Sequence, residues 1–157
     1  MFRRFFLPAA VVCFGMAAFA VAAAPEDALK GVKCLMVSKK DANAAQSAEW
    51  KKGKVYFCCG GCKGKFEKMD DKAKSKLAAA ANHQLVATKQ YVQKACPISG
   101  GKLNDAQSIT VNGAKVSFCC GNCKAKAEKM DAKDQVAELF SEAAFKKSKY
   151  EPAKKKS

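Results

Sequence analysis

The same arrangement of cysteines occurs twice in this chain of 157 residues, and it limits strongly what the chain can fold into. The first copy has the pattern C-x23-CC-x2-C and begins at Cys34, and the second has the pattern C-x22-CC-x2-C and begins at Cys96. The stretches 55–70 and 116–131 are identical at 12 of 16 aligned positions. Chance does not place eight thiols in this way. We therefore expect two related units, each organised around a group of cysteines.

The first 22 residues have the features of an export signal. A basic start at Arg3-Arg4 precedes an apolar run from Phe5 to Val21, and Ala20-Val21-Ala22 supplies the small-x-small pattern that a signal peptidase recognises. We expect cleavage after Ala22, and hence an exported protein that is periplasmic or secreted. The alternative is a retained membrane anchor, although an apolar run of about 17 residues lies at the lower limit for spanning a bilayer.

Cysteine content and size together predict that sulfur chemistry supports the fold. Of the nine cysteines, Cys13 leaves with the signal and eight remain, all of them inside the two repeats. Each repeat with its following helix covers about 40 residues, a size that rarely folds by apolar burial alone and usually needs a metal or disulfides. Large apolar residues are few between Cys34 and Met69. The sulfur groups are therefore expected to be structural requirements.

The formal net charge of +15 comes almost entirely from lysine. The chain lacks the Arg-rich face and the aromatic-studded strands typical of nucleic-acid binding, so we expect no nucleic-acid partner. A basic exported chain is better suited to an anionic surface of the cell envelope, and the lysine-rich tail, residues 146–157, is predicted to be a disordered basic end. The alternative is an ordinary solvated lysine surface. A protein partner cannot be named from the sequence.

Each repeat predicts a β-hairpin followed by a helix. Lys51-Lys52-Gly53 separates two β-prone segments in the first repeat, and Asn112-Gly113 in the second is the typical sequence of a type I′ turn. Apolar residues then recur at helical spacing, which predicts one helix per repeat. Its stripe is Cys62, Phe66, Met69, Ala73 and Leu77 in the first repeat and Cys123, Ala127 and Met130 in the second.

Asp134 is predicted to cap a further, C-terminal helix, whose stripe is Val136, Leu139, Phe140, Ala143 and Ala144. Between the repeats, Ala78–Ala81 are expected to finish a helix and residues 84–92 to be extended. This connector has too many apolar residues for a free linker, so we expect the two units to pack together.

The expected fold is a small α+β protein with two tandem treble-clef-like units, each a β-hairpin with a cysteine knuckle followed by a helix. The predicted order is a signal peptide (1–22), a leader (23–33), the first unit (34–81), a connector (82–95), the second unit with the C-terminal helix (96–145), and the basic tail (146–157).

The surroundings of the last cysteines favour thiolate over thiol. The glycines Gly60-Gly61 and Gly121 allow the tight turn that brings neighbouring thiolates to one ion. Cys62 and Cys123 are placed at helix N-termini, where the helix dipole favours an anion and lowers a thiol pKa. Lysines nearby add positive potential. These features favour metal binding.

The two repeats resemble a known family. Cys34-x23-Cys58-x3-Cys62 and Cys96-x22-Cys119-x3-Cys123 look like the C-x(19–22)-C-x3-C signature of TRASH domains, which are closely related to YHS domains. Residues 53–58 and 62–66 are similar to the YHS core GK-x-Y-F-C … C … F. Such domains are small treble-clef-like units implicated in heavy-metal sensing, trafficking and resistance. The resemblance implies a metal site in each unit, formed by Cys34, Cys58 and Cys62 and by Cys96, Cys119 and Cys123.

The chain departs from the family at three places. The gap of 23 residues between Cys34 and Cys58 is one residue longer than the quoted range. Many YHS units open with C-P-x-C, whereas the openings here are Cys34-Leu35-Met36-Val37 and Cys96-Pro97-Ile98-Ser99, without the second cysteine. Cys59 and Cys120 stand where the family usually has serine, and they are candidates for a fourth ligand. Three thiolates suit Cu(I) and four suit Zn(II), so the metal is left as Zn or Cu(I).

Three hypotheses follow. The first is an exported metal-binding protein with two thiolate sites, serving metal buffering, trafficking or resistance. The second is a disulfide-stapled exported scaffold for interactions, because an even number of cysteines in an exported chain is the ordinary setting for disulfides. The third is a thiol–disulfide redox protein using Cys59-x2-Cys62 and Cys120-x2-Cys123.

Other candidate residues are given structural roles. His83 lies far from both repeats in sequence, so we expect a structural or surface residue rather than a ligand. Met69 and Met130 could be soft ligands, but their place on the helix stripe favours core packing. The sequence contains no Ser-His-Asp set, phosphate loop or dinucleotide fingerprint, and we expect no enzyme.

Overall fold

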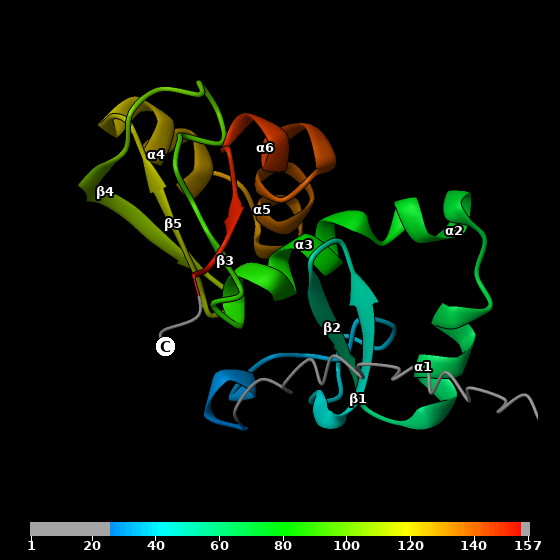
Figure 1. Cartoon of the computed structure of the whole chain (residues 1–157). Helices are drawn as coiled ribbons and strands as arrows, with labels where there is room; N and C mark the ends of the chain where they lie inside the picture. The colour runs from blue at the N-terminus through cyan, green and yellow to red at the C-terminus, as the bar shows by residue number, and fades with distance from the viewer. Residues whose placement is uncertain (1–25, 155–157) are drawn as a thin grey trace, which may run out of the picture.

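The computed structural model describes residues 26–154, which form a small α+β fold, as expected (Figure 1). The predicted signal peptide (1–22) lies outside the described residues. Within residues 26–154, no helix is long and apolar enough to cross a membrane. The elements are η1 (Glu26–Leu29), β1 (Asn43–Trp50), β2 (Gly53–Phe57), α1 (Gly60–Glu67), α2 (Asp71–Lys76), α3 (Ala78–Ala87), β3 (Tyr91–Val92), β4 (Asn104–Val111), β5 (Ala114–Phe118), α4 (Gly121–Glu128), α5 (Ala132–Leu139), α6 (Glu142–Lys147) and β6 (Glu151–Pro152).

The sequence repeat is also a structural repeat. Strands β1 and β2 form one antiparallel hairpin and β4 and β5 another, each with a two-residue turn and each with an irregular register at the same place in its first strand. Asn112 and Gly113 have φ angles of 44° and 87°, the two positive values that a type I′ turn requires. Each hairpin leads directly into a cysteine pair and a short helix, α1 or α4. Both predicted hairpins are confirmed.

The helices that follow are shorter than expected, because aspartates interrupt them. The predicted single helix from Cys62 to Leu77 is wrong: α1 ends at Glu67, and α2 begins after Asp70, whose carboxylate accepts the backbone N–H of Ala73 at 2.6 Å. An aspartate in this position satisfies amides at a helix start and so favours a new helix over continuation of the old one.

The second unit repeats this arrangement and corrects a predicted cap. Asp131, not Asp134, caps α5 by accepting the N–H groups of Lys133 and Asp134 at 2.9 and 2.8 Å. The predicted single C-terminal helix is two helices, because Ser141 starts α6 by accepting the N–H of Ala144 at 3.2 Å.

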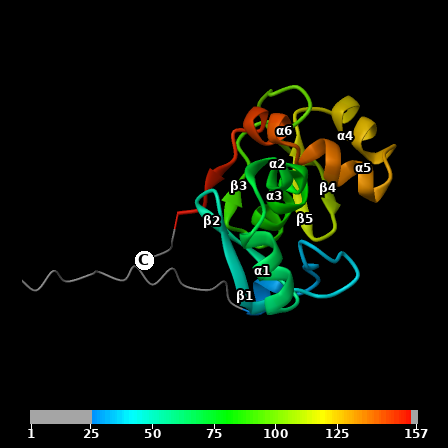
Figure 2. The same cartoon turned by 90° about the vertical axis from the view of Figure 1, so that its right-hand side faces the viewer.

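Helix α3 lies between the two hairpins and contacts elements of both units (Figures 1 and 2). The prediction that residues 84–92 are extended is wrong for 84–87, which belong to this helix, and Ala78 begins it rather than finishing one. Ala81, Asn82 and Leu85 are fully buried on it. Burial against β2, β5, α5 and α6 therefore outweighs the local preference of this segment. The two units pack together, as expected.

Three glutamines attach the segment around α3 to the outer edges of the hairpins. Gln84 accepts the N–H of Tyr56 at 2.8 Å and donates to its carbonyl at 3.1 Å. Gln90 makes the same pair of bonds with Lys54, both at 2.7 Å, and Gln93 with Ser117, at 2.9 and 2.8 Å. A strand edge needs partners for its backbone groups. Here side-chain amides take the place of a further strand.

The predicted basic tail is folded in its first part. Residues 146 and 147 belong to α6, Ser148 and Tyr150 are buried, and β6 pairs with β3. The Tyr150 ring stacks on Phe145 with 4.5 Å between ring centroids. The prediction of a disordered end is therefore wrong for residues 146–152, because Tyr150 gives this stretch an aromatic ring that packs on Phe145 of α6. Residues 155–157 lie outside the described part.

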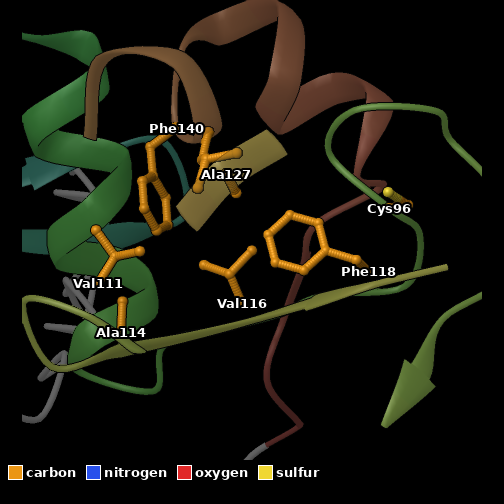
Figure 3. Packing of buried hydrophobic residues seen from close by; sticks show 8 residues of the cluster. Cys96, Val111, Ala114, Val116, Phe118, Ala127 and Phe140 are labelled. Atoms are coloured by element: carbon orange, nitrogen blue, oxygen red, sulfur yellow. The ribbon is translucent and has the colours of Figure 1, made fainter. Parts of the chain in front are cut away.

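Each unit has its own hydrophobic core, and the first cysteine of each repeat belongs to it. The first core contains Val55, Phe57 and Phe66 together with Cys34. The second contains Val116, Phe118 and Phe140 together with Cys96, which lies at the end of the cluster on the side of Phe118 (Figure 3). Phe66 of the first unit is replaced by the smaller Ala127 in the second, where Leu139 and Phe140 supply further apolar volume. Each cysteine cluster is thus continuous with a packed core.

Candidate metal centres

The six cysteines expected as metal ligands form two clusters of three. The sulfur atoms of Cys34, Cys58 and Cys62 all lie within 4.8 Å of one another, and so do those of Cys96, Cys119 and Cys123. The pairs Cys58–Cys62 and Cys119–Cys123 are each 3.7 Å apart. Thiolates that bind one ion at about 2.3 Å have sulfurs about 4 Å from one another. Both clusters are therefore close enough to bind a metal ion.

The same local elements place the sulfurs in both units. Cys34 lies in the loop before β1, where its N–H donates to the carbonyl of Lys40 at 2.8 Å. Cys58 follows the last residue of β2, and Cys62 lies in the first turn of α1. Leu35, the residue after Cys34, donates its N–H to the Tyr56 carbonyl at 3.1 Å, and this bond attaches the loop of Cys34 to β2. The end of the hairpin, the start of the helix and the loop of Cys34 thus bring the three sulfurs together.

Each cluster has one cysteine whose environment favours the thiolate. Burial raises the pKa of the Cys34 thiol, but hydrogen bonds from the backbone at Cys58, Met36 and Val37 outweigh it and bring the pKa below its usual value. Burial also raises the pKa of the Cys96 thiol. Hydrogen bonds from Ser99 and nearby backbone amides outweigh burial and lower this pKa to about 6.

Cys58, Cys62 and Cys123 hold their protons more strongly. Desolvation, followed by hydrogen bonds with neighbouring thiols, raises the pKa of Cys58 and of Cys123 to about 12, and desolvation also raises the pKa of Cys62. A second thiolate so close to the first is repelled by it unless a cation compensates. An ion entering either cluster would therefore displace protons from thiols.

Cys59 and Cys120 lie beside the clusters and are exposed. Their sulfurs are 3.8 Å from Cys58 and 3.6 Å from Cys119, but neither belongs to the group of three whose sulfurs all lie close together. Hydrogen bonds from the backbone at Cys62 and Cys123 lower the pKa of these two thiols. They stay candidates for a fourth ligand at the surface of each site.

All eight cysteines of residues 26–154 are free thiols. Sulfur pairs at 3.6–3.8 Å are far longer than the S–S bond of about 2.05 Å.

A residue that the sequence analysis did not assign to the site also reaches the second cluster. The hydroxyl oxygen of Ser99 lies 3.1 Å from the sulfur of Cys119. The available signal was its position, because Ser99 stands where the C-P-x-C opening of many YHS units has its second cysteine.

The remaining candidates have structural positions. The Nε2 atom of His83 lies 2.9 Å from the Val111 carbonyl, and its ring meets the Phe140 ring edge to face with centroids 5.0 Å apart. Burial lowers the pKa of His83, which favours the neutral ring. Met69 packs against the first core, and Met130 is half-buried. Within residues 26–154, His83 belongs to neither cysteine cluster.

Comparison with known proteins adds no relative: no protein-family model, curated protein or solved structure matches this chain. The likeness to TRASH and YHS domains therefore rests on the cysteine spacing and the adjoining residues.

Proposed function

We propose that this protein is an exported metal-binding protein that holds one Zn(II) or Cu(I) ion in each of two cysteine clusters and serves metal buffering, trafficking or resistance. The observation that carries the proposal is the presence of two equivalent groups of three cysteines, each with all sulfurs within 4.8 Å. Sets of soft sulfur donors bind Zn(II) and Cu(I) in preference to hard cations. The cysteine spacing supports the further proposal that the units are treble-clef-like members of the TRASH/YHS group.

The burial of the clusters supports exchangeable binding rather than a closed structural site. Cys34 and Cys96 are 3% and 0% exposed, whereas the other two cysteines of each cluster are partly exposed. An ion would therefore be anchored to the core from one side and reachable from solvent on the other. This suits a protein that takes up metal and passes it on. We propose no enzymatic activity.

Export and location rest on the sequence of residues 1–22. The net charge of +15 and the exposed lysines 146, 147 and 149 of the folded tail support contact with an anionic surface of the cell envelope.

The decisive experiment is native mass spectrometry of the mature protein, reduced and then loaded with Zn(II) or Cu(I). We expect two ions per chain, and one ion after Cys58→Ser or Cys119→Ser. Cys59→Ser is the matched control, because its sulfur lies outside the group of three; it should still bind two ions. The same measurement without reductant tests the alternative, because a disulfide scaffold would then be lighter by two hydrogens for each bridge and would bind no metal.

Thermal unfolding tests the link between metal and folding. Because Cys34 and Cys96 belong to the cores, binding free energy should appear as stability. The reduced, metal-free chain should therefore unfold at a lower temperature than the loaded chain, and acidification should reverse the gain as thiolates are protonated. A constant midpoint across a metal titration of the reduced chain would refute the proposal.

A further inference from the structure

We propose that the two clusters differ in metal preference, and that Ser99 is an oxygen ligand that makes the second cluster a Zn(II) site, whereas the first is a three-thiolate Cu(I) site. The inference rests on the proposed function and concerns the metals of the same two sites.

The Ser99 hydroxyl is held against the sulfurs of the second cluster. Its oxygen lies 3.1 Å from the sulfur of Cys119. The backbone N–H of Gly101 donates to this same oxygen at 3.2 Å, which fixes its position. The hydroxyl therefore lies beside the sulfur cluster, at its solvent-exposed edge.

The loop around Ser99 leaves room for this approach. A Cβ atom added at Gly101 would lie only 3.3 Å from both the Ser99 oxygen and the Cys119 Cβ. Gly100 has a φ angle of 77°, which a side chain rarely allows, and its N–H donates to the carbonyl of Cys96 at 2.8 Å. The two glycines thus fold the loop tightly and leave the space in which the serine meets the cluster.

The corresponding loop of the first unit is different. Both loops close with one equivalent hydrogen bond, from Cys34 to Lys40 at 2.8 Å and from Cys96 to Gly101 at 2.9 Å, so the first loop is one residue longer. Counted from the first cysteine, the residue at the place of Ser99 is Val37, a hydrocarbon side chain that is 37% exposed. Counted back from the closing hydrogen bond it is Ser38, whose hydroxyl makes no hydrogen bond to a cluster sulfur within residues 26–154. The sulfurs of the first cluster are hydrogen-bonded to one another and to backbone amides.

The oxygen of Ser99 would give the second cluster a set of ligands that favours Zn(II) over Cu(I), whereas the first cluster offers sulfur ligands alone. Zn(II) takes four ligands in a tetrahedron and accepts oxygen among them, whereas Cu(I) is satisfied by soft sulfur and gains little from a hydroxyl. The outer thiols do not produce the asymmetry, because Cys59 and Cys120 lie at similar distances from their clusters, 3.8 and 3.6 Å. Within residues 26–154, the Ser99 hydroxyl contacts a sulfur of the second cluster, and no hydroxyl contacts a sulfur of the first.

The first test compares affinities site by site. Full-length mature protein with Cys58→Ser and Cys62→Ser retains the second site, and Cys119→Ser with Cys123→Ser retains the first. Competition with chromophoric chelators gives the Zn(II) and Cu(I) affinities of each. We expect the ratio of Zn(II) to Cu(I) affinity to be about 10-fold or more higher at the second site, with Ser99→Ala lowering Zn(II) affinity by a similar factor and leaving Cu(I) affinity unchanged. Val37→Ala in the first site is the matched control and should change neither affinity.

The second test avoids the double variants, which could impair folding. Cadmium-113 is a spectroscopic stand-in for Zn(II), and the intact chain loaded with it should give two NMR signals. Ser99→Ala should move one signal and leave the other in place, and Val37→Ala should move neither far. Equal metal preference at both sites, or an equal effect of Ser99→Ala on both metals, would overturn the inference while leaving the metal-binding proposal intact. Failure of either cluster to bind any metal would instead overturn the proposed function.

Discussion

Asn82 offers the sharpest test of how the two units are joined. Its side chain is 0% exposed on α3, and its amide group donates to the Phe140 carbonyl and to the carboxylate of Glu142, both at 3.0 Å. Its oxygen accepts the indole N–H of Trp50 at 3.1 Å. Lys51 and Glu142 add an ion pair at 2.8 Å. One side chain thus connects the first hairpin to the segment between α5 and α6.

The cost of removing this amide can be worked out from its partners. In Asn82→Ala the buried Phe140 carbonyl and the partly buried Trp50 N–H lose these bonds, at about 1–3 kcal/mol for each such group. Glu142 has a side chain that is 52% exposed, so its lost bond adds little. We expect a loss of about 3 kcal/mol in the free energy of unfolding. With an m-value of about 2 kcal/mol per molar urea, the midpoint should fall by about 1.5 M.

Urea unfolding of the metal-loaded protein measures this loss. Trp50 is the only tryptophan, so its fluorescence reports directly on the affected contact. Asn43→Ala is the matched control, because the Asn43 side chain makes one exposed bond, to the N–H of Ala45 at 2.9 Å; it should cost less than about 1 kcal/mol. If Asn82→Ala costs less than about 1 kcal/mol at an unchanged m-value, the account of Asn82 as the connection between the units is wrong.

Two further outcomes are expected. Burial lowers the pKa of His83 in the folded protein, whereas the unfolded chain has the ordinary value of about 6.5. The unfolded state therefore takes up the proton first, stability should fall as the pH drops below about 6.5, and the fall should end below the folded-state pKa. His83→Gln should remove this component in unfolding curves compared with wild type between pH 7 and 5; parallel curves for the two proteins would contradict it. Gln93→Ala removes two hydrogen bonds to the edge of β5 at Ser117 and one to Ala95, and should cost about 2–3 kcal/mol by chemical denaturation. Gln46→Ala, in β1, whose side chain makes no hydrogen bond within residues 26–154, should cost less than about 1 kcal/mol, and equal losses for the two variants would argue against the role of the glutamines at the strand edges.

Local chemistry in the sequence determined the repeated part of the fold. A two-residue Asn-Gly turn has few alternatives to a hairpin, because its positive φ angles suit these residues. Two cysteines of each cluster are four residues apart, so a strand end and a helix start bring their sulfurs together. The third cysteine of each cluster was added by the resemblance to TRASH and YHS domains. The hairpins, the knuckles and the two clusters were for these reasons predictable residue by residue.

Only the tertiary structure decided the elements whose partners are distant in sequence. Residues 84–87 are helical, and Ser148 and Tyr150 are buried, because surfaces from both units meet there. No local pattern shows that three glutamine amides complete strand edges up to 36 residues away. The sequence position of Ser99 was a signal, but the contact of its hydroxyl with Cys119 depends on the fold of the loop that contains Gly100 and Gly101. Local backbone preferences differ by about 1 kcal/mol per residue. Burial and hydrogen bonds between distant residues therefore outweigh them wherever one segment packs against both units.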